Sequence, residues 1–325
     1  MKYLKKLGID IYMLLLLATA AMGVIVPAQG NAATVLGHVT FWAVALLFFL
    51  YGAKLDAGAV RSGLTNWRLQ GMTLAATYIL FPLVGLALSL LTGPVLGTTV
   101  TLGLLFLAVL PSTVQSSIAF TSMAGGNVPA AICAASVSNL VGVVLTPLLV
   151  AALLHVGEGG VRLDAVIKIA TQILLPFALG QVSRPWIGPH VTKHKALTLC
   201  ADRGAILLIV FSAFSAGTVS GLWASMDAAT LAMLVVVVLA FLAIAMSFIG
   251  WTGHWTGLPS ADKSVLFYCG STKSLATGLP IATALFPSGD LAVIVLPLMI
   301  YHMSQLLVCA GISQRAANRL AGTRA

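Results

Sequence analysis

Charge is the scarcest property of this 325-residue chain, in which Asp, Glu, Lys and Arg together make up 8% of the residues. An ordinary soluble protein has about 25% charged residues. A chain with so few cannot cover a core of this size with polar surface. The hydrophobic share of 59% and the mean hydropathy of +1.05 exclude a disordered chain as well. What remains is a helical protein that crosses a membrane several times.

Acidic residues and cysteines are also few, and their positions exclude several functions. All eight acids lie at or beyond the ends of the apolar runs, and the four cysteines are scattered through apolar stretches, which excludes a disulfide scaffold. With no paired carboxylates, no nucleophile–base set and no phosphate-binding loop, nothing supports an enzyme or an ATP-driven pump. His190 and His194 have helical metal-ligand spacing but no acid nearby, so we predict no metal site.

Ten apolar runs are long enough to cross the hydrocarbon core, which takes about 20 residues per helix. They cover residues 9–27, 33–53, 69–91, 98–124, 128–154, 165–183, 203–222, 228–250, 263–286 and 289–311. The first run could instead be a cleaved signal peptide, but the stretch from Leu7 to Val26 is longer than a usual signal core, and we retain it as a helix. The predicted fold class is an all-α polytopic membrane protein with ten transmembrane helices.

The basic residues predict the orientation. With the N-terminus inside, fourteen of the seventeen Lys and Arg residues fall in inner segments. Only Arg162 and Lys168 fall outside, and Lys273 falls within a span. The positive-inside rule then places both termini in the cytoplasm. We expect the chain to be a multi-pass protein of the plasma (inner) membrane. The net charge of +9 therefore reflects membrane topology and predicts no nucleic-acid partner.

Ten spans divide into two sets of five, residues 1–158 and 159–325, and an odd number per set makes the two copies face opposite ways. The fourth span of each set supports this division. The first contains Leu110-Pro111-Ser112-Thr113-Val114-Gln115-Ser116-Ser117, and the second contains Cys269-Gly270-Ser271-Thr272-Lys273-Ser274. Each places a helix breaker, Pro111 or Gly270, before a Ser-Thr cluster. Interrupted backbone at mid-membrane is tolerated only where it lines a cavity or is buried in protein.

The polar side chains around these two breaks are the candidate substrate-binding residues, since hydroxyl groups facing lipid would be costly. With one amide from the fifth span they are Ser112, Thr113, Gln115, Ser116, Ser117, Asn139, Ser271, Thr272, Lys273 and Ser274. Lys273 is the most informative, because a mid-span lysine costs about 2.5–3.5 kcal/mol on insertion scales. Three interpretations stay open: a counter-charge for the substrate, a built-in replacement for a coupling cation, or a structural lysine that bonds carbonyls of the opposite broken helix.

These motifs resemble the bile acid:sodium symporter family, nearest the divergent branch whose vertebrate and fungal members are implicated in calcium handling. The resemblance also rests on Phe49-Leu50-Tyr51-Gly52-Ala53-Lys54-Leu55, on Gly125-Gly126-Asn127 and on Asn139-Leu140-Val141-Gly142, and it covers almost the whole chain. It implies a panel domain from spans 1, 2, 6 and 7 and a core domain from the others, with spans 4 and 9 broken and crossing. It also implies two inverted five-helix repeats and alternating access, with an organic anion bound between the domains.

The sodium-coupled members of the family carry residues that this sequence lacks. Their glutamate of span 9 falls on Tyr268, their hydroxyl ligands of span 5 fall on Ala131 and Ala135, and Lys273 stands where the family has Asn. A hard cation prefers several oxygen ligands with a carboxylate among them. We therefore predict no cofactor. Sodium, the one ion that the resemblance raises, stays open as an alternative, although its usual ligands are absent.

The sequence thus predicts a secondary transporter of a small organic anion, embedded in the lipid bilayer and without enzymatic activity. The alternative is a non-transporting membrane regulator of cation (calcium) homeostasis that keeps the fold. The polar cluster at the two breaks separates these hypotheses, because a regulator has no need of a polar midplane. The substrate, the coupling ion, the direction of transport, a homo-oligomeric state and the charge of Lys273 stay open.

Overall fold

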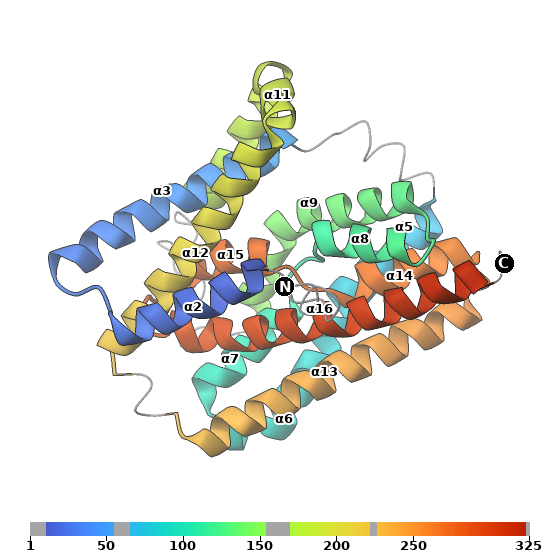
Figure 1. Ribbon diagram of the computed structural model, residues 1–325. Coiled ribbons are helices and arrows are strands. Elements are labelled where there is room, and N and C mark those ends of the chain that lie inside the picture. Colours follow the sequence, from blue (N-terminus) through green and yellow to red (C-terminus); the bar gives the residue numbers. More distant parts are fainter. Residues whose placement is uncertain (1–10, 55–65, 154–169, 222–225, 323–325) are drawn as a thin grey trace.

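The structure of the protein is a computed structural model that describes residues 11–54, 66–153, 170–221 and 226–322 (Figure 1). Within these ranges every regular element is a helix. The basic residues Arg61, Arg162 and Lys168 lie outside the described residues. So does residue 158, the boundary expected between the two repeats.

The helices follow the predicted apolar runs. They are α2 (Ile11–Ile25), α3 (Asn31–Lys54), α5 (Trp67–Ala75), η1 (Ala76–Leu80), α6 (Phe81–Leu96), α7 (Thr98–Ala108), α8 (Gln115–Met123), α9 (Val128–Leu153), η2 (Ala170–Leu174), α11 (Leu175–Lys193), α12 (Lys195–Val219), α13 (Ala228–Trp255), α14 (Ser260–Ser271), α15 (Leu275–Leu285) and α16 (Leu291–Gly322). Six stretches of the described chain are long and apolar enough to cross a membrane: Asn31–Lys54, Trp67–Leu96, Val128–Val150, Ala196–Val219, Ala228–Trp255 and Leu291–Leu320.

Helix α12 begins earlier than its predicted run, at Lys195 rather than at residue 203. The polar residues Thr198, Asp202 and Arg203 end the apolar run on its N-terminal side, but none of them breaks a helix. Asp202 and Arg203 therefore lie inside a helix, where the sequence placed them at a span end.

Packing divides the helices into two groups. The panel group consists of α2, α3, η2, α11 and α12, in which α3 packs on α11 and α2 packs on α12. The core group holds α5 to α9 and α13 to α16, and α12 meets it at α15 and α16. Figure 1 shows α3 and α11 rising from the core group at the upper left. This is the grouping that the family resemblance implies.

Glycines set the close approach of α3 and α11. A Cβ atom at Gly52 would overlap the Phe177 carbonyl oxygen, and one at Gly180 would overlap the Phe49 carbonyl oxygen. Small residues at such crossings let helix backbones pack closely, which is how membrane helices associate.

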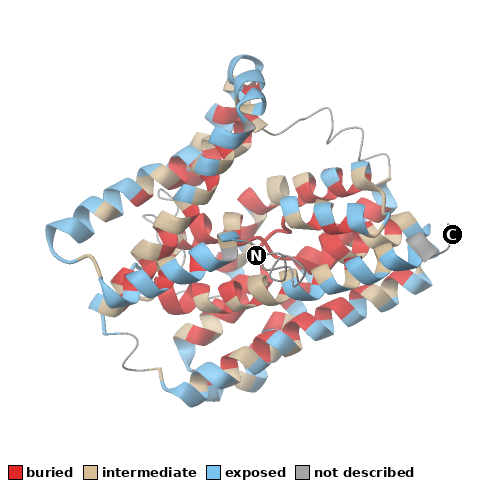
Figure 2. Cartoon of the chain, viewed as in Figure 1, coloured by how far each residue is buried: buried red, intermediate tan, exposed pale blue. Residues whose placement is uncertain are grey.

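The outer faces of the bundle are apolar. Figure 2 shows buried residues on the inward faces of the helices and exposed ones on the outward faces. On α13 the exposed side chains are large and hydrophobic: Leu231, Val236, Leu239, Ile244, Phe248, Trp251 and Trp255. A surface of this kind indicates lipid rather than water as its surroundings.

Candidate functional site

Two helices of the core group are interrupted, and the interruptions meet. One lies between α7, which ends at Ala108, and α8, which begins at Gln115. The other lies between α14, which ends at Ser271, and α15, which begins at Leu275. The Ser274 amide donates to the Pro111 carbonyl at 2.8 Å.

Hydroxyl groups join the two interruptions side by side. The Thr272 hydroxyl lies 3.0 Å from the Ser112 hydroxyl, and it accepts a hydrogen bond from the Thr113 hydroxyl at 3.0 Å. The Ser116 hydroxyl donates to Thr113 Oγ1 at 2.7 Å. These polar groups satisfy one another, because buried hydroxyls need partners where water is absent.

The predicted helix breaker lies within the first interruption but not within the second. Pro111 lies within the first interruption, as predicted. Gly270 lies inside α14, so the second interruption starts after it, at the C-cap Thr272. The role of Gly270 is close packing instead, because a Cβ there would lie 3.3 Å from the Ala76 Cβ.

Every carbonyl from residue 108 to 113 in the first interruption has a hydrogen-bond donor. The Lys273 side chain donates to the carbonyls of Ala108 and Leu110, and the Ser274 amide donates to the carbonyl of Pro111. The Thr146 hydroxyl donates to the Val109 carbonyl. The Asn139 amide donates to the Ser112 carbonyl, and the Ser117 hydroxyl donates to the Thr113 carbonyl. The last carbonyls of a helix have no partner within the helix, and buried ones must find donors elsewhere. The first interruption is therefore an ordered segment in which each of these carbonyls accepts a hydrogen bond.

The ammonium group of Lys273 is the centre of this network. Its Nζ donates to the carbonyls of Thr77, Ala108 and Leu110 at 3.0, 2.9 and 2.7 Å, and it lies 4.0 Å from the centre of the Phe81 ring. An ammonium has three N–H donors, so three carbonyls use all of them. Three acceptors and an aromatic face complement the charged form of the side chain. The Lys273 side chain is completely buried.

The Thr77 carbonyl is available to Lys273 because of the local sequence. Residues Ala76–Leu80 form a π-helical turn, so the Phe81 amide bonds the Ala76 carbonyl. The next residue is Pro82, which has no N–H to offer. Thr77 is thus left without a backbone donor, and the lysine supplies one. Wide turns of this kind occur often at functional sites.

The second interruption is fastened to α16. The Gln305 side chain accepts from the Lys273 amide at 2.7 Å and donates to the Lys273 carbonyl at 2.8 Å. The Tyr301 hydroxyl donates to the Ser271 carbonyl at 2.8 Å. On the other side, Asn139 of α9 donates to Ser112 at 2.8 Å and accepts from the Thr277 hydroxyl at 2.7 Å. Asn139 therefore bridges both interruptions.

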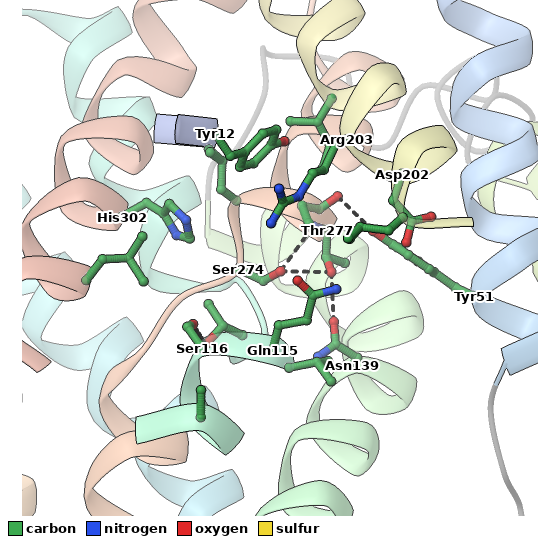
Figure 3. Close-up of a pocket in the computed structure, with 18 of the residues that line it drawn as sticks. Tyr12, Tyr51, Gln115, Ser116, Asn139, Asp202, Arg203, Ser274, Thr277 and His302 are labelled. Atoms are coloured by element: carbon green, nitrogen blue, oxygen red, sulfur yellow. Dashed lines mark hydrogen bonds between the residues drawn. The ribbon is translucent and has the colours of Figure 1, made fainter. Parts of the chain in front are cut away.

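A cavity of about 570 Å³ lies between the panel group and these interruptions (Figure 3). Five of the predicted site residues line it: Thr113, Gln115, Ser116, Asn139 and Ser274. The other five are buried and are not part of its lining: Ser112, Ser117, Ser271, Thr272 and Lys273. Lys273 therefore lies beside the cavity rather than in its lining.

The cavity also has polar groups that the sequence did not predict as site residues: Tyr12, Tyr51, Lys54, Asp202, Arg203 and His302. Lys54 Nζ and Asp202 Oδ2 form an ion pair at 2.6 Å. The Tyr51 hydroxyl donates to the Ala276 carbonyl at 3.4 Å, which links the panel group to the core group. The signal for this wall was Lys54 together with Asp202 and Arg203, but they were placed at the ends of spans.

An apolar helical bundle with interrupted helices that meet beside a cavity with several polar groups in its lining has the architecture of a secondary transporter. The sequence comparisons identify the family. The profile of the SBF-like CPA transporter family matches residues 10–318, so the chain belongs to that family. This confirms the membership in the bile acid:sodium symporter family that the motifs predicted. The protein is therefore a symporter-like integral membrane protein with transmembrane helices.

Three relatives illustrate the similarity. The uncharacterised protein PA2026 of Pseudomonas aeruginosa is 47% identical over 311 residues, which cover 95% of this chain and 93% of the relative. The Escherichia coli protein named "Putative symporter YfeH" is 41% identical over 307 residues, covering 94% and 92%. Sodium/bile acid cotransporter 7 of Danio rerio is 27% identical over 277 residues, covering 83% and 81%.

Proposed function

We propose that the protein is a secondary transporter that moves a small organic anion by alternating access. The observation that supports this most is the charge of the cavity. Lys54 and Arg203 carry two positive charges and Asp202 carries one negative charge, so the charged groups of the lining sum to +1 over the residues that the structure describes. A volume of about 570 Å³ is typical of sites for small molecules. The lining thus suits a monoanion.

The substrate would lie between the panel group and the polar residues of the interruptions. Gln115, Ser116 and Ser274 line the cavity there and offer hydroxyl and amide groups. Apolar side chains, among them Leu16, Val143 and Phe177, form much of the remaining wall. This mixture suits an amphipathic anion.

Transport in this proposal does not require sodium. Carbonyl oxygens that surround a buried positive charge are the environment that a bound cation would need, and here the Lys273 ammonium occupies it. A second cation beside it would be repelled. In this proposal Lys273 is a built-in replacement for a coupling cation.

The orientation belongs to the same proposal. The cavity is lined by the start of α2, the end of α3 and the start of α12, which the positive-inside rule places at the cytoplasmic side. In a plasma membrane with ten spans, two inverted repeats (1–158 and 159–325) and both termini inside, the cavity faces the cytoplasm. The opposite state would open after the panel group moves against the core group.

Uptake into proteoliposomes tests the proposal. Purified protein is reconstituted, and uptake of radiolabelled benzoate, hippurate and taurocholate is followed in sodium chloride and in choline chloride. We expect uptake of at least one anion above that of empty liposomes, at the same rate in both salts. Gln115→Leu should reduce it, whereas Gln314→Leu at the exposed end of α16 should not. Uptake of none of the three anions by the protein would contradict the proposal.

A further inference from the structure

Asp202 is the only acidic residue that lines the cavity, among the residues that the structure describes. Its side chain is 12% exposed, so it is largely buried yet borders the cavity. Figure 3 shows it beside Tyr51, with Arg203 between it and Tyr12. A negative charge in a cavity that binds an anion opposes that binding. The presence of a carboxylate at this place therefore calls for an explanation.

The hydrogen bonding of the Asp202 carboxylate is incomplete. Its Oδ2 accepts a hydrogen bond from Lys54 Nζ at 2.6 Å. Its Oδ1 is buried and has no hydrogen-bond partner among the described residues. A buried carboxylate oxygen without a donor is costly, whereas the same oxygen with a proton is an uncharged hydroxyl that can itself donate. Oδ1 is thus a position that can take up a proton.

Other titratable and charged side chains face Asp202 across the cavity, from α12 itself and from three helices packed against it. They are Tyr12 of α2, Tyr51 and Lys54 of α3, Arg203 of α12 and His302 of α16. Helices α11 and α15 also pack on α12, but in the described part of the chain they add no charged or titratable side chain to the lining. Lysine and arginine already carry their proton at neutral pH, and tyrosine does not gain one. Besides Asp202, this set leaves His302 as a proton acceptor.

The ring of His302 is already engaged by the core group. Its Nδ1 lies 2.9 Å from Gln305 Nε2, an amide nitrogen that only donates, so Nδ1 is the acceptor. The neutral ring then carries its proton on Nε2, and a second proton on Nδ1 would break this bond. Protonation of Asp202 Oδ1 breaks no hydrogen bond, so the geometry favours Asp202.

We propose that Asp202 is the proton site that couples anion transport to a proton gradient, so that a proton moves with each monoanion. The proton adds to Oδ1 from water in the cavity as the anion binds, and it leaves Oδ1 after the anion is released on the other side of the membrane. Protonation removes the negative charge beside the anion and frees Lys54 to bind it. Each ligand thereby strengthens the binding of the other by the same factor. This inference rests on the proposed function and adds the coupling ion to it.

A mobile proton supplies what Lys273 cannot. The Lys273 ammonium is completely buried and bonded to the carbonyls of Thr77, Ala108 and Leu110. A charge fixed to the chain can fill a cation site, but it cannot move down a gradient. Accumulation of the anion therefore needs an ion that travels with it. A proton with each monoanion also makes the transported pair electrically neutral.

Accumulation in proteoliposomes tests the coupling. Uptake of radiolabelled benzoate, hippurate and taurocholate is measured with the outside more acidic by about one pH unit, and empty liposomes correct for diffusion of the neutral acids. We expect an about tenfold accumulation of the transported anion, because a neutral pair follows the proton ratio. A potassium diffusion potential of either sign, set with valinomycin, should leave that value unchanged. Uptake that ignores the pH gradient or follows the potential would overturn the proposal.

Variants assign the coupling to a residue. Asp202→Asn cannot carry the proton, and the pH gradient should no longer drive accumulation. Asp202→Glu keeps an acid and should keep accumulation that depends on the pH gradient. Asp227→Asn, at the N-cap of α13 and outside the cavity, is the matched control and should accumulate the anion as the wild type does. Accumulation by Asp202→Asn equal to that of the wild type would place the proton on another residue and would also overturn the proposal.

Proton uptake on binding separates this proposal from that of transport. Each anion is added to purified protein in weakly buffered solution near neutral pH, and a pH-sensitive dye reports the protons taken up. We expect uptake of a proton with each bound anion in the wild type and in Asp227→Asn, and none in Asp202→Asn. If an anion is transported without proton uptake, the transporter stands and the proton site is rejected. If a proton is taken up on binding but no anion is transported, the proton site stands and the transport proposal is rejected. If no anion binds or is transported, both are rejected.

Discussion

The ammonium nitrogen of Lys273 donates a 2.7 Å hydrogen bond to the carbonyl oxygen of Leu110. Leu110 precedes Pro111 in the first interruption, and Lys273 lies in the second, so one side chain fastens the two interrupted helices together. The same nitrogen bonds Ala108, the last residue of α7, where the helix dipole favours a positive charge. The lysine thus occupies the position of a cation held between carbonyl groups.

Replacing this lysine should destabilise the protein strongly. Lys273→Met keeps a long apolar side chain but leaves three buried carbonyls without a donor. At about 1–3 kcal/mol for each unpaired group, we expect a loss of at least about 3 kcal/mol. Thermal unfolding of the purified protein, followed by tryptophan fluorescence, measures it. Lys263→Met near the start of α14 is the control, and equal losses in the two variants would show that the carbonyl bonds contribute little.

The bridge at Asn139 predicts a second effect. Asn139→Ala removes the donor to Ser112 and the acceptor for Thr277, and each interruption loses a bond to α9. We expect a loss of about 2 kcal/mol in stability and of most anion uptake. Asn318→Ala, at the exposed end of α16, should change neither. Full uptake by Asn139→Ala would mean that the bridge is not needed for transport.

The crossing of α3 and α11 gives a prediction with an internal control. Gly180→Ala places a methyl group against the Phe49 carbonyl, which is backbone and cannot turn aside. The helices must separate, at a cost of about 1–3 kcal/mol. Gly37→Ala lies in the same helix as Phe49, in open space, and should stabilise by about 0.5–1 kcal/mol. The melting temperatures of the two variants should therefore move in opposite directions.

The orientation can be read from a native thiol. Cys200 is exposed on α12, while Cys133, Cys269 and Cys309 are buried. With the start of α12 at the cytoplasmic side, an impermeant maleimide should leave Cys200 unlabelled in intact cells and label it in inverted vesicles. Cys200→Ser should abolish the labelling. Labelling in intact cells would place this end of the bundle outside.

The helices could be predicted from the sequence because hydropathy and helix length are local properties. Pro111 predicted the first interruption correctly, because proline has no N–H to donate to a helix. The second interruption was placed near Gly270 but begins at Thr272, because a glycine permits a break without requiring one. The sequence left open a structural lysine that bonds carbonyls of the opposite broken helix, and Lys273 does bond the carbonyls of Ala108 and Leu110. Which carbonyls it bonds could not be predicted, since every residue has one.

The panel wall of the cavity was missed for a different reason. Asp202 directly precedes the apolar run of residues 203–222 and Arg203 begins it, and a hydropathy criterion places such residues at the end of a span. Helix α12 nevertheless begins at Lys195, which carries both residues into the bundle. Lys54 and Asp202 are 148 residues apart in sequence, and they pair only because α3 packs against α12. No local pattern in the sequence predicts that pairing.

The most direct test of the central claim is thermal unfolding of the wild-type protein in sodium chloride and in choline chloride at equal ionic strength. A sodium site filled at 100 times its Kd would stabilise the protein by about 2.7 kcal/mol, a shift that is readily measured. If the Lys273 ammonium replaces the cation, the melting temperature is the same in both salts. A sodium-specific rise would contradict the account, because a cation site would then exist beside the lysine.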